Sequence, residues 1–129
     1  MASHGGCYCG AVRYTVSGAL RDVIYCHCSQ CRKQSGHFYA ATSCATDNLD
    51  IKGAEKLTWF RASDEARRGF CSVCGSALFW QRVGADTTSI LAGSLENPTG
   101  LKAQGHIFVA DKGDYYDIGD GLPRHLQAG

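Results

Sequence analysis

The sequence predicts a mainly β fold, built as small folded-over antiparallel sheets with cysteine clusters at strand ends. Three observations predict it: short runs of alternating apolar and polar residues, 16 glycines against two prolines, and seven of eight cysteines in three tight groups. Alternation with a period of two is typical of half-buried strands, and glycine suits the many turns that short strands need. Clustered cysteines can bind metal ions, which would stabilise a domain of this size.

The expected strands follow one another along the chain and end at glycine, asparagine or aspartate. In the first, residues 12–16, Val12, Tyr14 and Val16 alternate with Arg13 and Thr15 and share one face. Most of the others mix β-branched and aromatic residues, as strands do. They cover residues 23–25, 38–42, 57–60, 77–80, 89–92 and 106–110.

Helix signals are weak and predict only short pieces. One or two turns are expected over residues 30–34, with Ser29 as the cap and Gly36 as the stop. A second short piece is expected near residues 63–66. Residues 97–100 and 119–121 are rich in glycine, asparagine and aspartate and are expected to be loops.

Length, charge and the N-terminal segment exclude several classes of function. With 129 residues, the chain is expected to be a single domain over 1–129. Its net charge is +1 and its basic runs are only pairs, such as Arg32-Lys33, so we expect no nucleic-acid partner. The N-terminus lacks a signal-peptide pattern and no apolar run reaches transmembrane length, which predicts a cytoplasmic protein without membrane association. The oligomeric state is not predicted.

The expected compartment decides how the cysteines are interpreted. In a reducing cytosol, clustered cysteines are metal ligands rather than disulfides, and CxC spacing makes two thiols compete for the same space. Zinc is the metal that such sulfur sets prefer in structural sites. We therefore expect two zinc ions per chain, the second of which can be only partly occupied.

The first expected site is a closed four-thiolate zinc formed by Cys7, Cys9, Cys71 and Cys74, here called the four-cysteine cluster. Residues two apart on an extended strand point to one face, and a CxxC pair followed by glycine forms a turn around a metal. Four thiolates around one dication leave a charge of −2. Backbone amides, together with Arg67 or Arg68, are expected to offset it. This zinc would have a structural role.

The second expected site is the three-cysteine cluster of Cys26, Cys28 and Cys31, which offers three ligands and leaves one position open. An open zinc site can bind a substrate atom, whereas a closed one cannot. Three thiolates make the ion a modest Lewis acid, better suited to holding a substrate thiol as thiolate than to activating water. These three residues are the predicted catalytic residues.

Alternatives to an open zinc site remain at this stage. His27, His37 or Cys44 could complete the coordination; a strand would point His27 away from the cluster, whereas His37 could fold back. The ion could also be weakly held, leaving free thiols, or Cys26 and Cys31 could be a redox pair, which the β-rich context disfavours. Cys44 is expected to be a buried, inert residue.

Four segments together resemble one known family. Residues 7–14, 26–36, 70–78 and 106–124 are similar, in order, to those of the glutathione-dependent formaldehyde-activating enzymes, also called the GFA or CENP-V/GFA domain family. The resemblance implies an Mss4-like fold and carbon–sulfur lyase activity. It assigns a structural zinc to Cys7, Cys9, Cys71 and Cys74, and a catalytic zinc to Cys26, Cys28 and Cys31.

The implied reaction adds a small thiol, glutathione or a similar one, to formaldehyde or a related aldehyde, or runs in reverse, as in an S-(hydroxymethyl)glutathione synthase. The alternative is a non-catalytic, zinc-stabilised binding module. The chain departs from the family in being short and in carrying Tyr115-Tyr116 where many relatives have tryptophan. No substrate-binding residue is predicted; Arg32, Lys33 or Arg124 could receive a carboxylate, and His106 is expected to be a packed core histidine.

Overall fold

Two β-sheets form most of the protein, whose computed structural model describes residues 2–128. The larger sheet has seven strands in the order β10-β3-β4-β9-β8-β7-β6, and the smaller has three in the order β1-β2-β5. Neighbouring strands are antiparallel, except that β10 runs parallel to β3. The predicted mainly β class is confirmed. The strands are β1 (Ala2–Gly6), β2 (Arg13–Ser17), β3 (Val23–Cys26), β4 (Tyr39–Ala45), β5 (Leu49–Lys52), β6 (Leu57–Arg61), β7 (Ala66–Cys71), β8 (Ala77–Arg82), β9 (Thr87–Leu91) and β10 (Ala103–Ile107).

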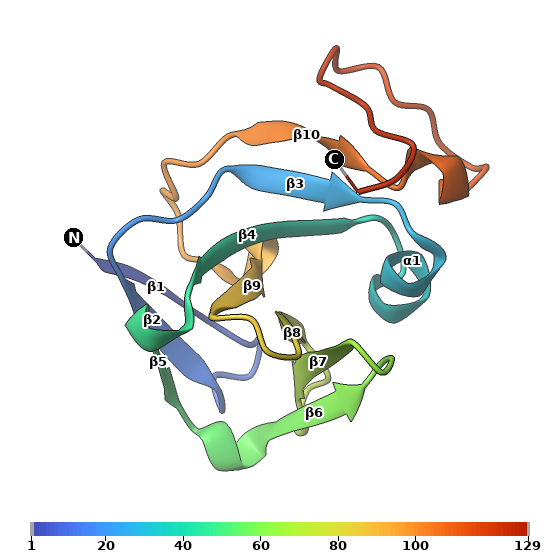
Figure 1. Ribbon diagram of the computed structural model, residues 1–129. Coiled ribbons are helices and arrows are strands. Elements are labelled where there is room, and N and C mark those ends of the chain that lie inside the picture. The colour runs from blue at the N-terminus through green and yellow to red at the C-terminus, as the bar shows by residue number, and fades with distance from the viewer. Residues whose placement is uncertain (1, 129) are drawn as a thin grey trace.

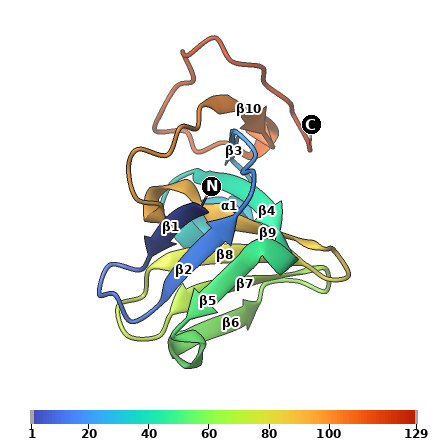
Figure 2. The same cartoon turned by 90° about the vertical axis from the view of Figure 1, so that its left-hand side faces the viewer.

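The larger sheet curves strongly, so that β10 and β6 lie at opposite ends of an arc (Figure 1). The smaller sheet lies across one side of this arc, and the C-terminal segment passes beyond β10 (Figure 2). Short 3-10 turns connect several strands, and none of the helices within residues 2–128 is long and apolar enough to cross a membrane. These turns cover Thr46–Asn48, Ala54–Lys56, Ala92–Ser94 and Val109–Asp111.

The main core lies between the two sheets. On β2, Tyr14 and Val16 are buried while Arg13 and Ser17 are exposed, which confirms the alternation expected there. The ring of Tyr14 packs edge-on against Phe79 of β8, with centroids 5.4 Å apart. Other buried members of this cluster include Val12, Leu78, Ile90, Cys44 and two residues of the four-cysteine cluster, Cys7 and Cys71.

The helix α1 (Ser29–Ser35) follows β3 directly, where a short helix is expected. Its N-cap is Cys28 rather than Ser29, because the Cys28 sulfur accepts a hydrogen bond from the Cys31 amide at 3.2 Å. A side-chain acceptor at the N-cap satisfies an amide that has no partner within the helix. Gly36 ends the helix in the left-handed conformation (φ 84°), as expected.

Some expected elements differ from the structure. Residues 63–65 form a bend instead of a helix, because the Ser63 hydroxyl accepts the amides of Glu65 and Ala66 and closes a hairpin between β6 and β7. The strand expected over 106–110 instead covers Ala103–Ile107, since Phe108 adopts a left-handed backbone (φ 55°) that ends it. The sequence patterns did not predict β1, β5 or β7.

Candidate functional site

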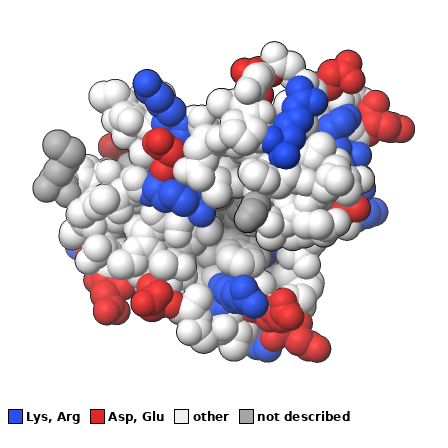
Figure 3. Space-filling model, turned by 45° about the horizontal axis from the view of Figure 1, so that its top comes forward, with Lys and Arg blue, Asp and Glu red and all other residues white. Residues whose placement is uncertain are grey.

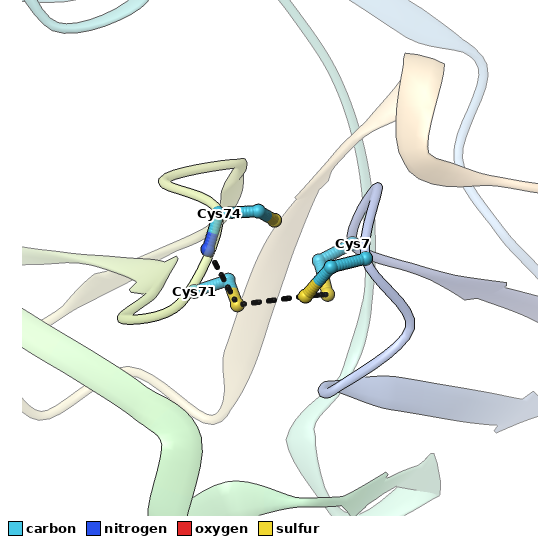
Figure 4. Close-up of side chains that lie close together, drawn as sticks. Cys7, Cys71 and Cys74 are labelled. Atoms are coloured by element: carbon cyan, nitrogen blue, oxygen red, sulfur yellow. Dashed lines mark hydrogen bonds between the residues drawn. The ribbon is translucent and has the colours of Figure 1, made fainter.

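The four-cysteine cluster joins the turn after β1 to the end of β7. The sulfurs of Cys7, Cys9, Cys71 and Cys74 all lie within 4.8 Å of one another. Cys7–Cys9 and Cys9–Cys71 sulfur distances are 3.6 and 3.8 Å, close to the edge of about 3.8 Å that a tetrahedron with zinc–sulfur bonds of about 2.3 Å requires. Figure 4 shows Cys7 facing Cys71 and Cys74 across this space. The donor set and its dimensions therefore fit zinc.

The local structure of this cluster differs in two ways from the prediction. Cys7 and Cys9 lie in a turn that follows β1, not on an extended strand, so the turn and not the strand pleat brings their sulfurs together. The expected backbone donors are present: the Val12 amide is 3.3 Å from the Cys7 sulfur, and the Val73 amide is 3.4 Å from the Cys71 sulfur. Such donors offset the negative charge of thiolates.

The two arginines expected to support this cluster lie elsewhere. Arg67 stacks on Trp59, 4.0 Å from the ring centroid, and donates to Gln81. Arg68 points to the opposite face of β7, where its Nη2 lies 3.3 Å from the sulfur of Cys31. Alternation along β7 explains the difference, because adjacent side chains leave a strand on opposite faces.

The three-cysteine cluster lies where β3 passes into α1. Cys26 ends β3, Cys28 caps the helix and Cys31 is in its first turn, and their sulfurs all lie within 4.8 Å of one another. The Cys26 and Cys31 sulfurs are 3.2 Å apart, so they would separate by about 0.6 Å to reach the spacing of zinc ligands. With that small movement, three sulfurs from one short segment can hold a metal ion.

The protonation of the three thiols depends on their closeness. Hydrogen bonds from Cys26 and Cys31 lower the pKa of the Cys28 thiol to about 2. The same contacts, first that with Cys28, raise the pKa of the Cys26 thiol far above its usual value. The sulfurs therefore share protons, and a cation between them would be needed for all three to ionise together.

The structure brings none of the three suggested fourth ligands to this cluster. Cys44 is buried in the main core. His37 is exposed, and its Nδ1 bonds the Tyr115 hydroxyl at 2.7 Å. His27 is 1% exposed and turns away from the two cysteines that flank it. Among residues 2–128, the group of metal-ligating side chains here contains three cysteines and no fourth member.

A hydrogen-bonded row of four polar side chains, of which only the two histidines are buried, lies behind the cysteines and was not predicted. The Tyr116 hydroxyl bonds His27 Nδ1 at 2.6 Å, and His27 Nε2 bonds His106 Nδ1 at 2.8 Å. His106 Nε2 bonds Asp120 at 2.8 Å. Burial, followed by the nearby His106, lowers the pKa of His27 to about 4, so its ring is neutral. Because the carboxylate can only accept, each ring donates from Nε2 and the Tyr116 hydroxyl donates to His27.

This row of hydrogen bonds should stabilise the protein, because it links the C-terminal segment to the end of β3. Replacing His106 by leucine keeps its volume but leaves Nε2 of His27 buried without a partner. We expect the free energy of unfolding to fall by about 2–3 kcal/mol, measured by urea denaturation. His125→Leu, at an exposed site of the same segment, is the control and should change it by less than about 0.5 kcal/mol. Equal effects would show that the hydrogen bonds contribute little.

A cavity of about 460 Å³ opens beside the three-cysteine cluster, and all three cysteines line it. Its apolar wall comes from β3, β8 and β10 and includes Ile24, Trp80 and Ile107. Arg32, Lys33 and Arg124, the cations suggested from the sequence, do not line it. The arginines on its wall are Arg21, Arg68 and Arg82. The basic residues on the cavity wall therefore come from β7, β8 and the segment before β3, and not from α1 or the C-terminal segment.

Comparison with protein families identifies one match. The family model described as glutathione-dependent formaldehyde-activating enzyme (GFA) matches residues 2–111. This range contains both cysteine clusters and ends within the last 3-10 turn. The match therefore covers most of the chain, including every residue singled out as a metal ligand.

Individual relatives agree with this match. A Halomonas elongata protein, provisionally named a glutathione-dependent formaldehyde-activating enzyme, is 30% identical over 92% of this chain and 82% of its own length. An uncharacterized lyase of Schizosaccharomyces pombe is 26% identical over 88% of this chain and 83% of its own. The crystal structure of a Rhodobacter sphaeroides protein is similar with a TM-score of 0.63 and 29% identity, over 78% of this chain and 97% of that one.

Proposed function

Because the chain belongs to the glutathione-dependent formaldehyde-activating enzyme (GFA) family, we propose that it is a zinc-dependent carbon–sulfur lyase. It would add a small thiol, glutathione or a similar one, to formaldehyde or a related aldehyde, or catalyse the reverse. One observation carries the proposal: three sulfurs that can hold a metal ion line a cavity of about 460 Å³. A purely structural site has no need of such a space.

The two clusters would have separate roles in this enzyme. Cys7, Cys9, Cys71 and Cys74 would hold a structural zinc with no free position, as closed four-sulfur sites do. Cys26, Cys28 and Cys31 would hold the catalytic ion. That ion, when bound, would keep a substrate thiol ionised near neutral pH, and a thiolate is the nucleophile that adds to aldehydes.

The protein around the three-cysteine cluster would position and shield the reactants. Trp80, Ile24 and Ile107 form an apolar wall that limits water around the sulfurs. Lower water content strengthens electrostatic interactions with a bound thiolate. The cavity is far larger than formaldehyde needs, so most of its volume would serve the thiol. Positioning two reactants in one pocket is itself a source of rate enhancement.

A specific observation supports the alternative, a binding module. Tyr8 is 94% exposed and Val73 is 61% exposed, and each lies between two cysteines of the four-cysteine cluster. Exposed apolar side chains on two adjacent turns can contact a partner protein. Neither residue lines the cavity, so the two roles predict different sensitive residues.

Metal content and turnover test the proposal together. Elemental analysis of freshly purified protein should give two zinc ions per chain. Proton NMR should then show that the protein accelerates formation of the hydroxymethyl thioether from formaldehyde and at least one thiol in a panel that includes glutathione. Tyr8→Ser should leave this rate unchanged. Two zinc ions without acceleration for any pair of thiol and aldehyde would favour the binding module.

A further inference from the structure

Arg68 is a buried cation with no acidic partner. Its side chain is 5% exposed, and none of the carboxylates in residues 2–128 forms an ion pair with it. Nε and Nη2 both donate to the side-chain oxygen of Gln30, at 2.9 and 2.8 Å. The guanidinium carbon lies 4.9 Å from the ring centroid of Tyr39. A buried charge is costly unless an opposite charge is present, so this position requires an anion.

The three-cysteine cluster supplies such an anion on one side of the guanidinium. Nη2 of Arg68 lies 3.3 Å from the Cys31 sulfur, which is a charge-assisted contact when the sulfur is ionised. The other terminal nitrogen, Nη1, is buried and has no hydrogen-bond partner within residues 2–128. A guanidinium has two donor hydrogens on Nη1, and leaving them unpaired is unfavourable.

Arg68 also lines the cavity, on the same wall as the cysteines. Nη1 and Nη2 are bonded to the same carbon, so the unpaired nitrogen is an immediate neighbour of the one that contacts Cys31. The formal charges of the other lining side chains are also mainly positive: Arg21 and Arg82 against Glu65. Figure 3 shows lysine and arginine side chains on several sides of a hollow on this face of the molecule.

We propose that Arg68 is the fixed positive charge of this cavity and that it attracts an anionic oxygen of the ligand toward the three-cysteine cluster. The inference rests on the proposed function and adds the residue that recognises the ligand. Gln30 holds the guanidinium through two donors, Nε and Nη2, and a charge fixed in this way beside the sulfurs favours anionic ligands.

The anionic oxygen has two sources in the proposed reaction. One is a carboxylate carried by the thiol. The other is the oxygen of the aldehyde: the sulfur electron pair forms the new carbon–sulfur bond, and the carbon–oxygen π pair moves to oxygen as an alkoxide. Water then donates a proton to this alkoxide. The hydroxide that remains takes up the proton that the thiol released on ionising. A positive charge near an alkoxide lowers the barrier for its formation.

A labelling experiment tests anion binding without any enzymatic activity. Iodoacetate and iodoacetamide both alkylate a thiolate with release of iodide, and they differ in that the first carries a carboxylate. In the full-length protein as purified, mass spectrometry would give the ratio of their rates at Cys26, Cys28 and Cys31. Cysteines of the four-cysteine cluster provide the internal reference. Arg68→Met should lower the ratio at least about fivefold, because a fixed charge recruits an anion to its neighbourhood.

Arg67→Met is the matched control, since Arg67 is the adjacent arginine of β7 and lies outside the cavity. It should leave the ratio unchanged. Arg68→Lys keeps the charge but loses the paired donors that Gln30 holds, so the charge is less firmly placed and the ratio should be intermediate. This variant is used if Arg68→Met fails to fold. If the ratio in both Arg68 variants equals that of the unsubstituted protein, Arg68 is only a structural residue and the inference is wrong.

Turnover of two thiols with formaldehyde distinguishes the two sources. If the oxygen is a carboxylate, Arg68→Met should raise KM for 3-mercaptopropionate at least about tenfold and leave 2-mercaptoethanol unaffected. If it is the alkoxide, kcat should fall for both thiols with little change in KM. Unchanged kinetics for both would overturn the inference. Absence of turnover in the unsubstituted protein would refute the proposed function alone, since the alkylation ratio still tests Arg68.

Discussion

Replacing Cys71 by serine is expected to lower the free energy of unfolding by about 3–5 kcal/mol and Tm by about 10–20 °C. Cys71 is fully buried, and with Cys74 it would link the middle of the chain to the turn that carries Cys7 and Cys9. Cys9 and Cys71 are 62 residues apart, and a cross-link that closes a loop of that length is worth about 4 kcal/mol through the unfolded chain. Because the link would be a metal ion, its binding energy adds directly to folding.

Thermal unfolding and elemental analysis of the same preparations measure this effect. Cys44→Ala is the matched control, because Cys44 is also a buried cysteine of the main core but belongs to neither cluster. It should keep both metal ions and cost only about 1 kcal/mol for a small cavity. Chelation by a strong zinc ligand should destabilise the unsubstituted protein and have little further effect on Cys71→Ser. If Cys71→Ser and Cys44→Ala cost the same, the four-cysteine cluster does not hold a stabilising ion.

The sequence was informative where structure depends on short-range spacing. The strand around Tyr14 was predicted because buried and exposed residues alternate strictly along it. The two cysteine sets were predicted because CxC and CxxC spacings bring two or three sulfurs together within one turn or helix start, although the two pairs of the four-cysteine cluster are 62 residues apart. In contrast, β7 reads Ala-Arg-Arg-Gly-Phe-Cys, which has two adjacent arginines and a glycine in place of alternation. Its pairing with β6 and β8 makes it a strand.

Because β7 was not predicted, the position of Arg68 at the cavity was not predicted either. Two adjacent arginines look equivalent in the sequence, but a strand sends Arg67 to Trp59 and Arg68 to the cavity. The partner of Arg68, Gln30, is 38 residues away in the chain, so no local pattern could reveal the contact. The same holds for His27 and His106, which are 79 residues apart and meet only because β10 pairs with β3. The contacts that could not be predicted from the sequence are therefore those that depend on pairing between distant strands.

Substitution of Cys28 by serine is expected to separate catalysis from folding. The Cys28 sulfur has two functions: it belongs to the three-cysteine cluster, and it caps α1 by accepting the Cys31 amide. Serine is a good N-cap residue but a poor zinc ligand. We therefore expect the variant to lose one of two zinc ions and at least about 100-fold in turnover, because even indirect support of a metal ligand is worth about 10–100-fold.

The folding of this variant should change little, because the cap is retained and the four-cysteine cluster is intact. Thermal unfolding should show a loss below about 1 kcal/mol, whereas Cys28→Ala, which removes ligand and cap together, should lose about 1 kcal/mol more. The comparison with Cys71→Ser then decides whether the three-cysteine cluster is structural, like the four-cysteine cluster, or catalytic. Equal unfolding of Cys28→Ser and Cys71→Ser would mean that both clusters are structural. A stable Cys28→Ser variant with one zinc ion and no turnover would leave catalysis as the function of the second cluster.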